Sequence, residues 1–147
     1  DKSTIPKGHS LLNKYKVVTT SAYPKKSFVA NTPTVDNVKK RLADLIEVMP
    51  KNSAFGRSRM MLFCSDNEKD CDNFVKYTKT RFFAYLVLQE PNKGSSIGYI
   101  IPDQDFTANS DIDWSRPIPE IDQQLYKKYG LTEQEIEFIE SKVKEMK

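Results

Sequence analysis

The residues of this chain best suited to chemistry are basic side chains that lie among aromatic residues. Arg57 and Arg59 flank Ser58 just after a glycine, and on a strand they would project to the same face because side chains alternate. A guanidinium can donate two hydrogen bonds to guanine, so these arginines are the best candidates for reading bases. Phosphate binding needs only mobile cations on one face. The candidates for DNA contact are Lys14, Lys16, Tyr23, Lys25, Lys26, Arg57, Arg59, Lys79 and Arg81, with Lys39, Lys40 and Arg41 beside them.

Charge is unevenly distributed along the sequence. Residues 1–66 contain 12 Lys/Arg and 5 Asp/Glu, whereas residues 103–147 contain 6 and 11, within a net charge of +3. A basic half of this kind suits contact with a polyanion. The acidic tail would be repelled by a polyanion and suits protein or solvent. The plainer interpretation of the basic residues, as ordinary solvated side chains, stays open.

Residues for covalent catalysis are sparse. His9 is the only histidine and lies in a polar segment, so it supports no nucleophile–base pair. The five glycines match no phosphate-binding motif. Two cysteines are too few for a disulfide framework, and we expect reduced thiols, with Cys64 in the core and Cys71 exposed or half-exposed. We therefore expect no catalytic centre, no metal site and no cofactor in this chain.

Four aspartates, Asp103, Asp105, Asp111 and Asp113, are the remaining candidates for catalysis. A metal-dependent nuclease would place such acids beside a lysine, but no acid-x-Lys pattern follows Pro102 on a strand. The plainer interpretation is an acidic surface loop in which aspartates stabilise turns. The nuclease is the third of three functional hypotheses.

Apolar periodicity and turn residues predict the elements that must position these side chains. We expect strands over residues 14–21, 27–30, 58–65 and 97–102, and we expect the strand at 58–65 to be buried. We expect helices from Thr34 to Pro50, from an Asp66 N-cap to Leu86, and over 121–129 before Gly130. A capping box of Thr132 and Glu135 opens the last helix.

This order of elements indicates an α+β (mixed α/β) fold: a small mixed sheet with packed helices and a C-terminal helical pair. The 147 residues fit a single domain, with residues 103–147 as an acidic, mostly helical tail. No apolar run is long enough to cross a membrane, and no signal peptide is evident. Because the first residue is Asp rather than Met, we expect a domain excised from a longer protein.

Three stretches of sequence are similar to a known family. They are residues 12–23, which include Lys-Tyr-Lys-Val-Val and Ser-Ala-Tyr; residues 77–87, Tyr-Thr-Lys-Thr-Arg-Phe-Phe-Ala-Tyr-Leu-Val; and residues 99–140, with Ile-Pro-Asp-Gln-Asp-Phe, Trp-Ser and Leu-Tyr-Lys-Lys-Tyr-Gly-Leu-Thr. They resemble the C-terminal, target-recognition portion of adenine-specific DNA methyltransferases of type II restriction–modification systems, including fused restriction–methylation enzymes. Residues 24–57 match weakly, and Ala84 stands where the family commonly has arginine.

The resemblance implies a DNA target-recognition domain that is not catalytic by itself. Its partners would be double-stranded DNA and a methyltransferase core or restriction subunit, in the cytoplasm. The parent protein would be a DNA (adenine-N6) methyltransferase, alone or fused to an endonuclease, that uses S-adenosylmethionine. This chain lacks both the Asn/Asp-Pro-Pro-aromatic loop and the glycine-containing cofactor loop of such enzymes.

A second hypothesis from another class is a protein–protein docking or structural module of the same system. Its contact surface would be the amphipathic last helix together with Trp114, Tyr126 and Tyr129, which this hypothesis takes as exposed. Salt separates the two ideas, because DNA binding weakens steeply as salt rises and an apolar contact does not.

Overall fold

The computed structural model describes residues 9–20, 46–89 and 101–143. Its elements in chain order are η2 (His9–Leu11), β1 (Tyr15–Thr20), β2 (Glu47–Met49), β3 (Arg59–Ser65), α3 (Glu68–Thr78), α4 (Arg81–Gln89), α6 (Ile118–Lys128) and α7 (Glu133–Lys142). The α+β class is confirmed. The predicted strand at 27–30, the predicted helix as far as residue 45, and most of the predicted strand at 97–102 lie outside the described residues.

The three described strands form one sheet in the order β2-β1-β3, and both pairings are antiparallel. The central strand β1 carries the β-branched run Val17–Thr20, which favours extended backbone. A register irregularity falls between Val17 and Val18, opposite β3. The predicted strand at 58–65 is confirmed as β3, but it is half-buried rather than buried.

Strand β2 corrects the sequence prediction. The residues before Pro50 were expected to end a helix, whereas Glu47–Met49 pair with β1, with Val48 opposite Val17. Three residues are too few to show a helical or a strand period, so pairing with β1 decides their conformation.

The long helix predicted from Asp66 to Leu86 is also wrong in one respect, because it is two helices. Asn67, not Asp66, caps α3, and its side chain accepts a hydrogen bond from the Lys69 amide at 3.0 Å. The chain then breaks at Lys79 and Thr80. The Thr80 hydroxyl accepts a hydrogen bond from the Phe83 amide at 3.1 Å and caps α4 as an N-cap threonine does.

The carboxylate of a residue that is distant in sequence stabilises this break. Asp122 of α6 accepts hydrogen bonds from the backbone amides of Arg81 and Phe82, both at 3.0 Å. These amides are among the donors that the first turn of a helix leaves unpaired. The start of α4 therefore depends on α6.

The core lies between α3, α4, α6 and the segment that precedes α6. Aromatic rings dominate it: Phe63 stacks on Phe74 with centroids 5.1 Å apart, and Phe106 meets both edge-on. Trp114 is 3% exposed, and its indole N–H donates to the Asp105 carbonyl at 2.8 Å. The fully buried residues include Tyr77, Ile121, Leu125 and Tyr126.

The cysteines differ from the prediction. Cys71 is completely buried on the inner face of α3, whereas Cys64 is only half-buried; both are free thiols. Burial raises the pKa of the Cys71 thiol to about 11.

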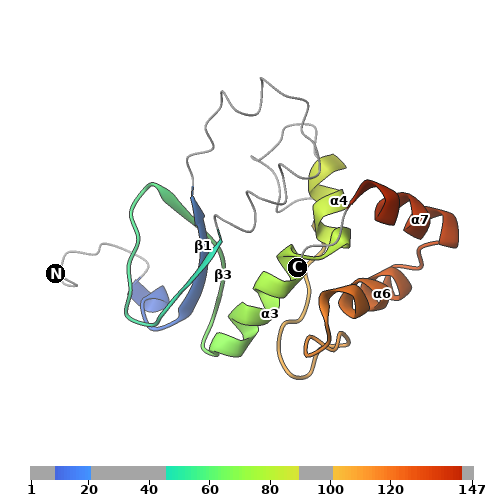
Figure 1. The fold of residues 1–147 in the computed structure, drawn as a ribbon. Coiled ribbons are helices and arrows are strands. Elements are labelled where there is room, and N and C mark those ends of the chain that lie inside the picture. The colour runs from blue at the N-terminus through green and yellow to red at the C-terminus, as the bar shows by residue number, and fades with distance from the viewer. Residues whose placement is uncertain (1–8, 21–45, 90–100, 144–147) are drawn as a thin grey trace, which may run out of the picture.

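The C-terminal helical pair is confirmed. Gly130 follows α6 with a φ of 63°, the left-handed conformation that favours glycine after a helix. Thr132 and Glu135 form the predicted capping box, in which the Glu135 carboxylate accepts from the Thr132 amide at 2.8 Å. In Figure 1 the sheet lies on one side, α6 and α7 lie on the other, and α3 and α4 run between them.

Candidate nucleic-acid interface

Lys14 lies just before β1, at one end of the sheet. Its ammonium contacts the Asp66 carboxylate at 3.0 Å, and Asp66 is largely exposed. This hydrogen bond raises the pKa of Lys14 and lowers the pKa of Asp66. An exposed pair of this kind is weak, so a phosphate can take the place of Asp66.

Lys16 does not lie at the surface, which corrects its prediction as a DNA-contacting residue. It is 2% exposed, and its Nζ donates to the backbone carbonyls of Lys14, Leu11 and Leu12 at 2.6, 3.1 and 3.3 Å. Burial lowers the pKa of its ammonium group. The side chain closes the carbonyl end of η2 and is not available to a phosphate.

Arg57 and Arg59 lie at the opposite end of the sheet from Lys14, but not as the predicted pair on one strand. Arg57 belongs to a turn in which the Arg59 amide donates to the Gly56 carbonyl at 3.1 Å, and β3 begins only at Arg59. Arg57 is exposed. The Arg59 guanidinium contacts the Glu47 carboxylate of β2 at 3.0 Å.

Arg81 contacts another helix and does not extend the basic surface. Its guanidinium lies 3.6 Å from the Glu140 carboxylate of α7, and its Nε is buried without a hydrogen-bond partner. Lys79, half-buried, ends α3, with its backbone amide donating to the Lys76 carbonyl at 3.0 Å. The remaining predicted residues Tyr23, Lys25 and Lys26, with Lys39, Lys40 and Arg41, lie outside the described residues.

Lys51 belongs to this surface and was missed from the sequence. It is exposed two residues after β2, and its Nζ lies 5.2 Å from the centre of the Tyr15 ring. Because Met49 pairs with Lys16, Lys51 lies at the same end of the sheet as Lys14. The signal that could have found it is its place directly after Pro50, in a turn beside the strand.

The exposed and half-exposed cations of the sheet are therefore Lys14 and Lys51 at one end and Arg57 and Arg59 at the other. Thr20 pairs with Arg59, and six residue steps separate Lys14 from Thr20. At about 3.3 Å per step, the two ends lie roughly 20 Å apart. This length matches about six base pairs of DNA, at 3.4 Å each.

Acidic residues gather on the other side of the molecule. Described residues 101–143 contain ten Asp/Glu against four Lys/Arg, whereas 9–20 and 46–66 contain two against five. The separation of charge along the sequence is thus also a separation in space (Figure 1). A polyanion would approach the sheet and be repelled by α6 and α7.

Three of the four aspartates of the nuclease hypothesis stabilise local structure. Asp105 accepts from the Thr107 amide at 2.8 Å, Asp113 accepts from the Ser115 amide at 3.0 Å, and Asp111 pairs with Lys128 at 2.8 Å. Hydrogen bonds from the side chains of Thr107 and Ser115, followed by those from their amides, lower the pKa of Asp105 and of Asp113. Within residues 9–20, 46–89 and 101–143, no three His, Cys, Asp or Glu side chains come together as metal ligands would.

The surface predicted for the docking hypothesis is wrong for two of its three aromatic residues. Trp114 and Tyr126 are 3% and 1% exposed and belong to the core. Tyr129 is 38% exposed and stacks on Phe82 with centroids 5.1 Å apart. An indole or phenol group can be buried once its apolar ring is packed, so an aromatic residue in a polar segment is a poor guide to exposure.

Comparison of the chain with protein-family models, with curated proteins and with solved structures finds no match. In the part of the chain that the structure describes, no helix has both the length and the apolar character needed to cross a bilayer.

Proposed function

We propose that this chain is a DNA target-recognition domain that contacts the duplex through the two ends of its sheet. The observation that carries the proposal is the position of Lys14, Lys51, Arg57 and Arg59 at these ends, opposite an acidic helical side. Lys14 and Lys51 would bind phosphates. Arg57 and Arg59 would approach base edges, where guanidinium groups can discriminate guanine.

Binding of this kind would replace contacts with surface carboxylates by contacts with DNA. Lys14 and Arg59 each hold a surface carboxylate, Asp66 and Glu47, at 3.0 Å. On DNA the contact of Lys14 would give way to a phosphate and that of Arg59 to a base edge, and counterions released from the phosphates would supply much of the affinity.

The sequence motifs supply the wider context of the proposal. They resemble the target-recognition portion of adenine-specific methyltransferases of restriction–modification systems. The chain would then work in the cytoplasm, joined to a methyltransferase core or restriction subunit. That core would bind S-adenosylmethionine and hold the flipped adenine, while this domain selects the site without catalysis of its own.

Fluorescence anisotropy of a labelled mixed-sequence duplex, titrated with the chain at 50 and 200 mM salt, tests the proposal. The two phosphate contacts of Lys14 and Lys51 predict about a ten-fold loss of affinity between these salt concentrations. The variant Lys51→Ala/Arg57→Ala should weaken binding and, through the loss of Lys51, reduce the salt slope by about 1. The matched control Lys127→Ala/Lys142→Ala removes the same charge from exposed positions of α6 and α7 and should leave binding unchanged or only slightly weaker.

Two results would contradict the proposal. One is the absence of binding at 50 mM salt by a chain that circular dichroism shows to be folded. The other is equal weakening by the sheet variant and the helix control, since that would indicate contact without a defined face.

A further inference from the structure

An arginine and a glutamate meet at one end of the sheet, although their strands are not neighbours. Arg59 begins β3, Glu47 begins β2, and the central strand β1 lies between them. Both residues project to the same face, because Arg59 pairs with Thr20 and Glu47 pairs with Val18, two residues apart on β1. The two side chains bridge this strand, with Arg59 Nη1 and Glu47 Oε2 3.0 Å apart.

This pair is accessible to a partner. The Arg59 and Glu47 side chains are 39% and 58% exposed. Nη1 of Arg59 also donates to the Met49 sulfur at 3.7 Å, so both contacts use the same guanidinium nitrogen. The other two nitrogens carry three of the five N–H donors of a guanidinium. Because an exposed ion pair contributes little free energy, a ligand that offers partners to both groups can engage them together.

Together the two side chains present hydrogen-bonding groups in a defined order. The guanidinium offers two neighbouring donors, and the carboxylate beside it offers an acceptor. In the major groove a G·C pair presents the complementary order, which is the N7 and O6 acceptors of guanine followed by the N4 amino donor of cytosine. Guanine O6 and cytosine N4 are hydrogen-bonded to each other, so they lie about 3 Å apart. The guanidinium and the carboxylate have the same spacing.

An A·T pair does not match this order of groups. It presents the adenine N7 acceptor, the adenine amino donor, the thymine O4 acceptor and the thymine methyl group. If the carboxylate accepts from the adenine amino group, it lies beside the N7 acceptor, and the methyl group takes the place of one partner of the guanidinium. Donors and acceptors that lose water without gaining a partner weaken binding. The order of groups therefore favours G·C over A·T.

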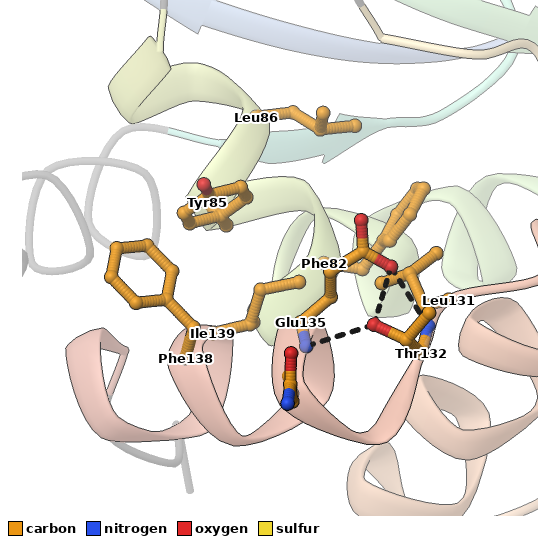
Figure 2. A pocket seen from close by; sticks show the side chains of 9 residues that line it. Phe82, Tyr85, Leu86, Leu131, Thr132, Glu135, Phe138 and Ile139 are labelled. Carbon is orange, nitrogen blue, oxygen red and sulfur yellow. Dashed lines mark hydrogen bonds between the residues drawn. The ribbon is translucent and has the colours of Figure 1, made fainter.

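Carboxylates on the acidic side of the molecule have other contacts. Glu135 of α7 accepts from the Thr132 amide and hydroxyl at 2.8 and 3.0 Å (Figure 2). Arg116 lies between two carboxylates, Asp113 at 3.2 Å and Glu120 at 3.8 Å, so negative charge predominates around it and would repel a duplex. The pair on the sheet lies instead on the basic side.

We infer that Arg59 and Glu47 together read one G·C base pair in the major groove, the guanidinium on guanine and the carboxylate on cytosine N4. This role rests on the proposed function and deepens it, because it gives Glu47 a part in recognition and predicts a G·C pair in the target. The charge of Glu47 also repels DNA phosphates from this end of the sheet. Glu47 thus contributes selectivity at a cost in affinity.

The test uses the full chain and two labelled duplexes of equal length, one of alternating G·C and one of alternating A·T pairs, in fluorescence anisotropy at about 50 mM salt. We expect the chain to bind the G·C duplex about ten-fold more tightly. Replacement of guanine by 7-deazaguanine, which lacks the N7 acceptor, should weaken the G·C duplex at least about three-fold. Arg59→Lys keeps the charge but loses the planar pair of donors, so the preference should disappear.

Glu47→Ala should bind the A·T duplex more tightly than the unchanged protein does, and its preference for G·C should fall at least about three-fold. A loss of folding would not produce this combination, because it would weaken both duplexes. Asp66→Ala is the matched control, since it removes an exposed carboxylate that contacts Lys14 at the other end of the sheet. It should raise the affinity for both duplexes by the same factor and leave the preference unchanged.

Three results would overturn the role of the pair while leaving the proposed function standing. These are equal affinity of the protein for the two duplexes, an unchanged preference in Glu47→Ala, and an equal fall in preference in Asp66→Ala. Absence of binding to either duplex would overturn the proposed function, and the role of Glu47 with it.

Discussion

Replacement of Asp122 with alanine tests the account of how α4 begins. The variant leaves the backbone amides of Arg81 and Phe82 without the acceptors that they reach at 3.0 Å. Phe82 is 5% exposed, so water cannot fully replace the carboxylate at its amide. A buried donor without a partner costs about 1–3 kcal/mol. We expect Asp122→Ala to lower the free energy of unfolding by about 2–4 kcal/mol at pH 5.

Urea denaturation gives this free energy directly. Trp114 is the only tryptophan and is 3% exposed, so its fluorescence reports the loss of the core. The comparison is Thr132→Ala, which removes an exposed cap from α7 and should cost about 1 kcal/mol. If Asp122→Ala costs no more than Thr132→Ala, the Asp122 side chain does not hold the start of α4.

The pH dependence of the same variant provides an independent check. Burial raises the pKa of Asp122 from 3.8 to about 6, although its hydrogen bonds to Phe82 and Arg81 act in the opposite direction. A raised pKa means that the folded chain binds the proton more tightly than the unfolded chain. The stability due to this proton is therefore fully present below about pH 4 and lost as pH rises through about 6. A difference of about 2 in pKa corresponds to about 3 kcal/mol. The free energy lost in Asp122→Ala should thus be smaller at pH 8 than at pH 5, and a loss that grows with pH would refute this.

Two further predictions concern single side chains. In the native protein at pH 8, a thiol reagent should modify Cys71 only after unfolding, because the thiol is fully buried and its pKa is about 11; rapid modification of both cysteines would contradict this. Gly130→Ala should lower the free energy of unfolding by about 1 kcal/mol in the same urea assay, because its φ of 63° disfavours a side chain, and an unchanged midpoint would contradict the strained turn.

The features predicted correctly from the sequence depend on neighbours in the chain. The capping box of Thr132 and Glu135 and the turn at Gly130 each form within a few residues. The β-branched residues of β1 favour extended backbone wherever it pairs. Local chemistry alone is enough to place such elements.

The features that the sequence missed depend on distant partners. The break between α3 and α4 lies inside a continuous helical pattern and needs Asp122, about 40 residues away. Arg81 contacts Glu140 of α7 instead of extending the basic surface. In both cases a charged residue has a tertiary partner that no local pattern shows. Lys16 is different, because its ammonium donates to backbone carbonyls only two to five residues away, and its burial depends on the local conformation of η2 and the turn after it.

The break between α3 and α4 has a consequence for the order of folding. In the broken form the two amides at the start of α4 have acceptors only once Asp122 of α6 has docked, so before that event residues 68–89 would satisfy them in another way. A single continuous helix would pair the amides of Arg81 and Phe82 with the carbonyls of Tyr77 and Thr78. The break between α3 and α4 would then form late, when a long-range contact is made, and it would not nucleate folding. Docking of α6 and α7 would convert one continuous helix into α3 and α4. Because the contact of Asp122 would form after the rate-limiting step, we do not expect Asp122→Ala to slow refolding.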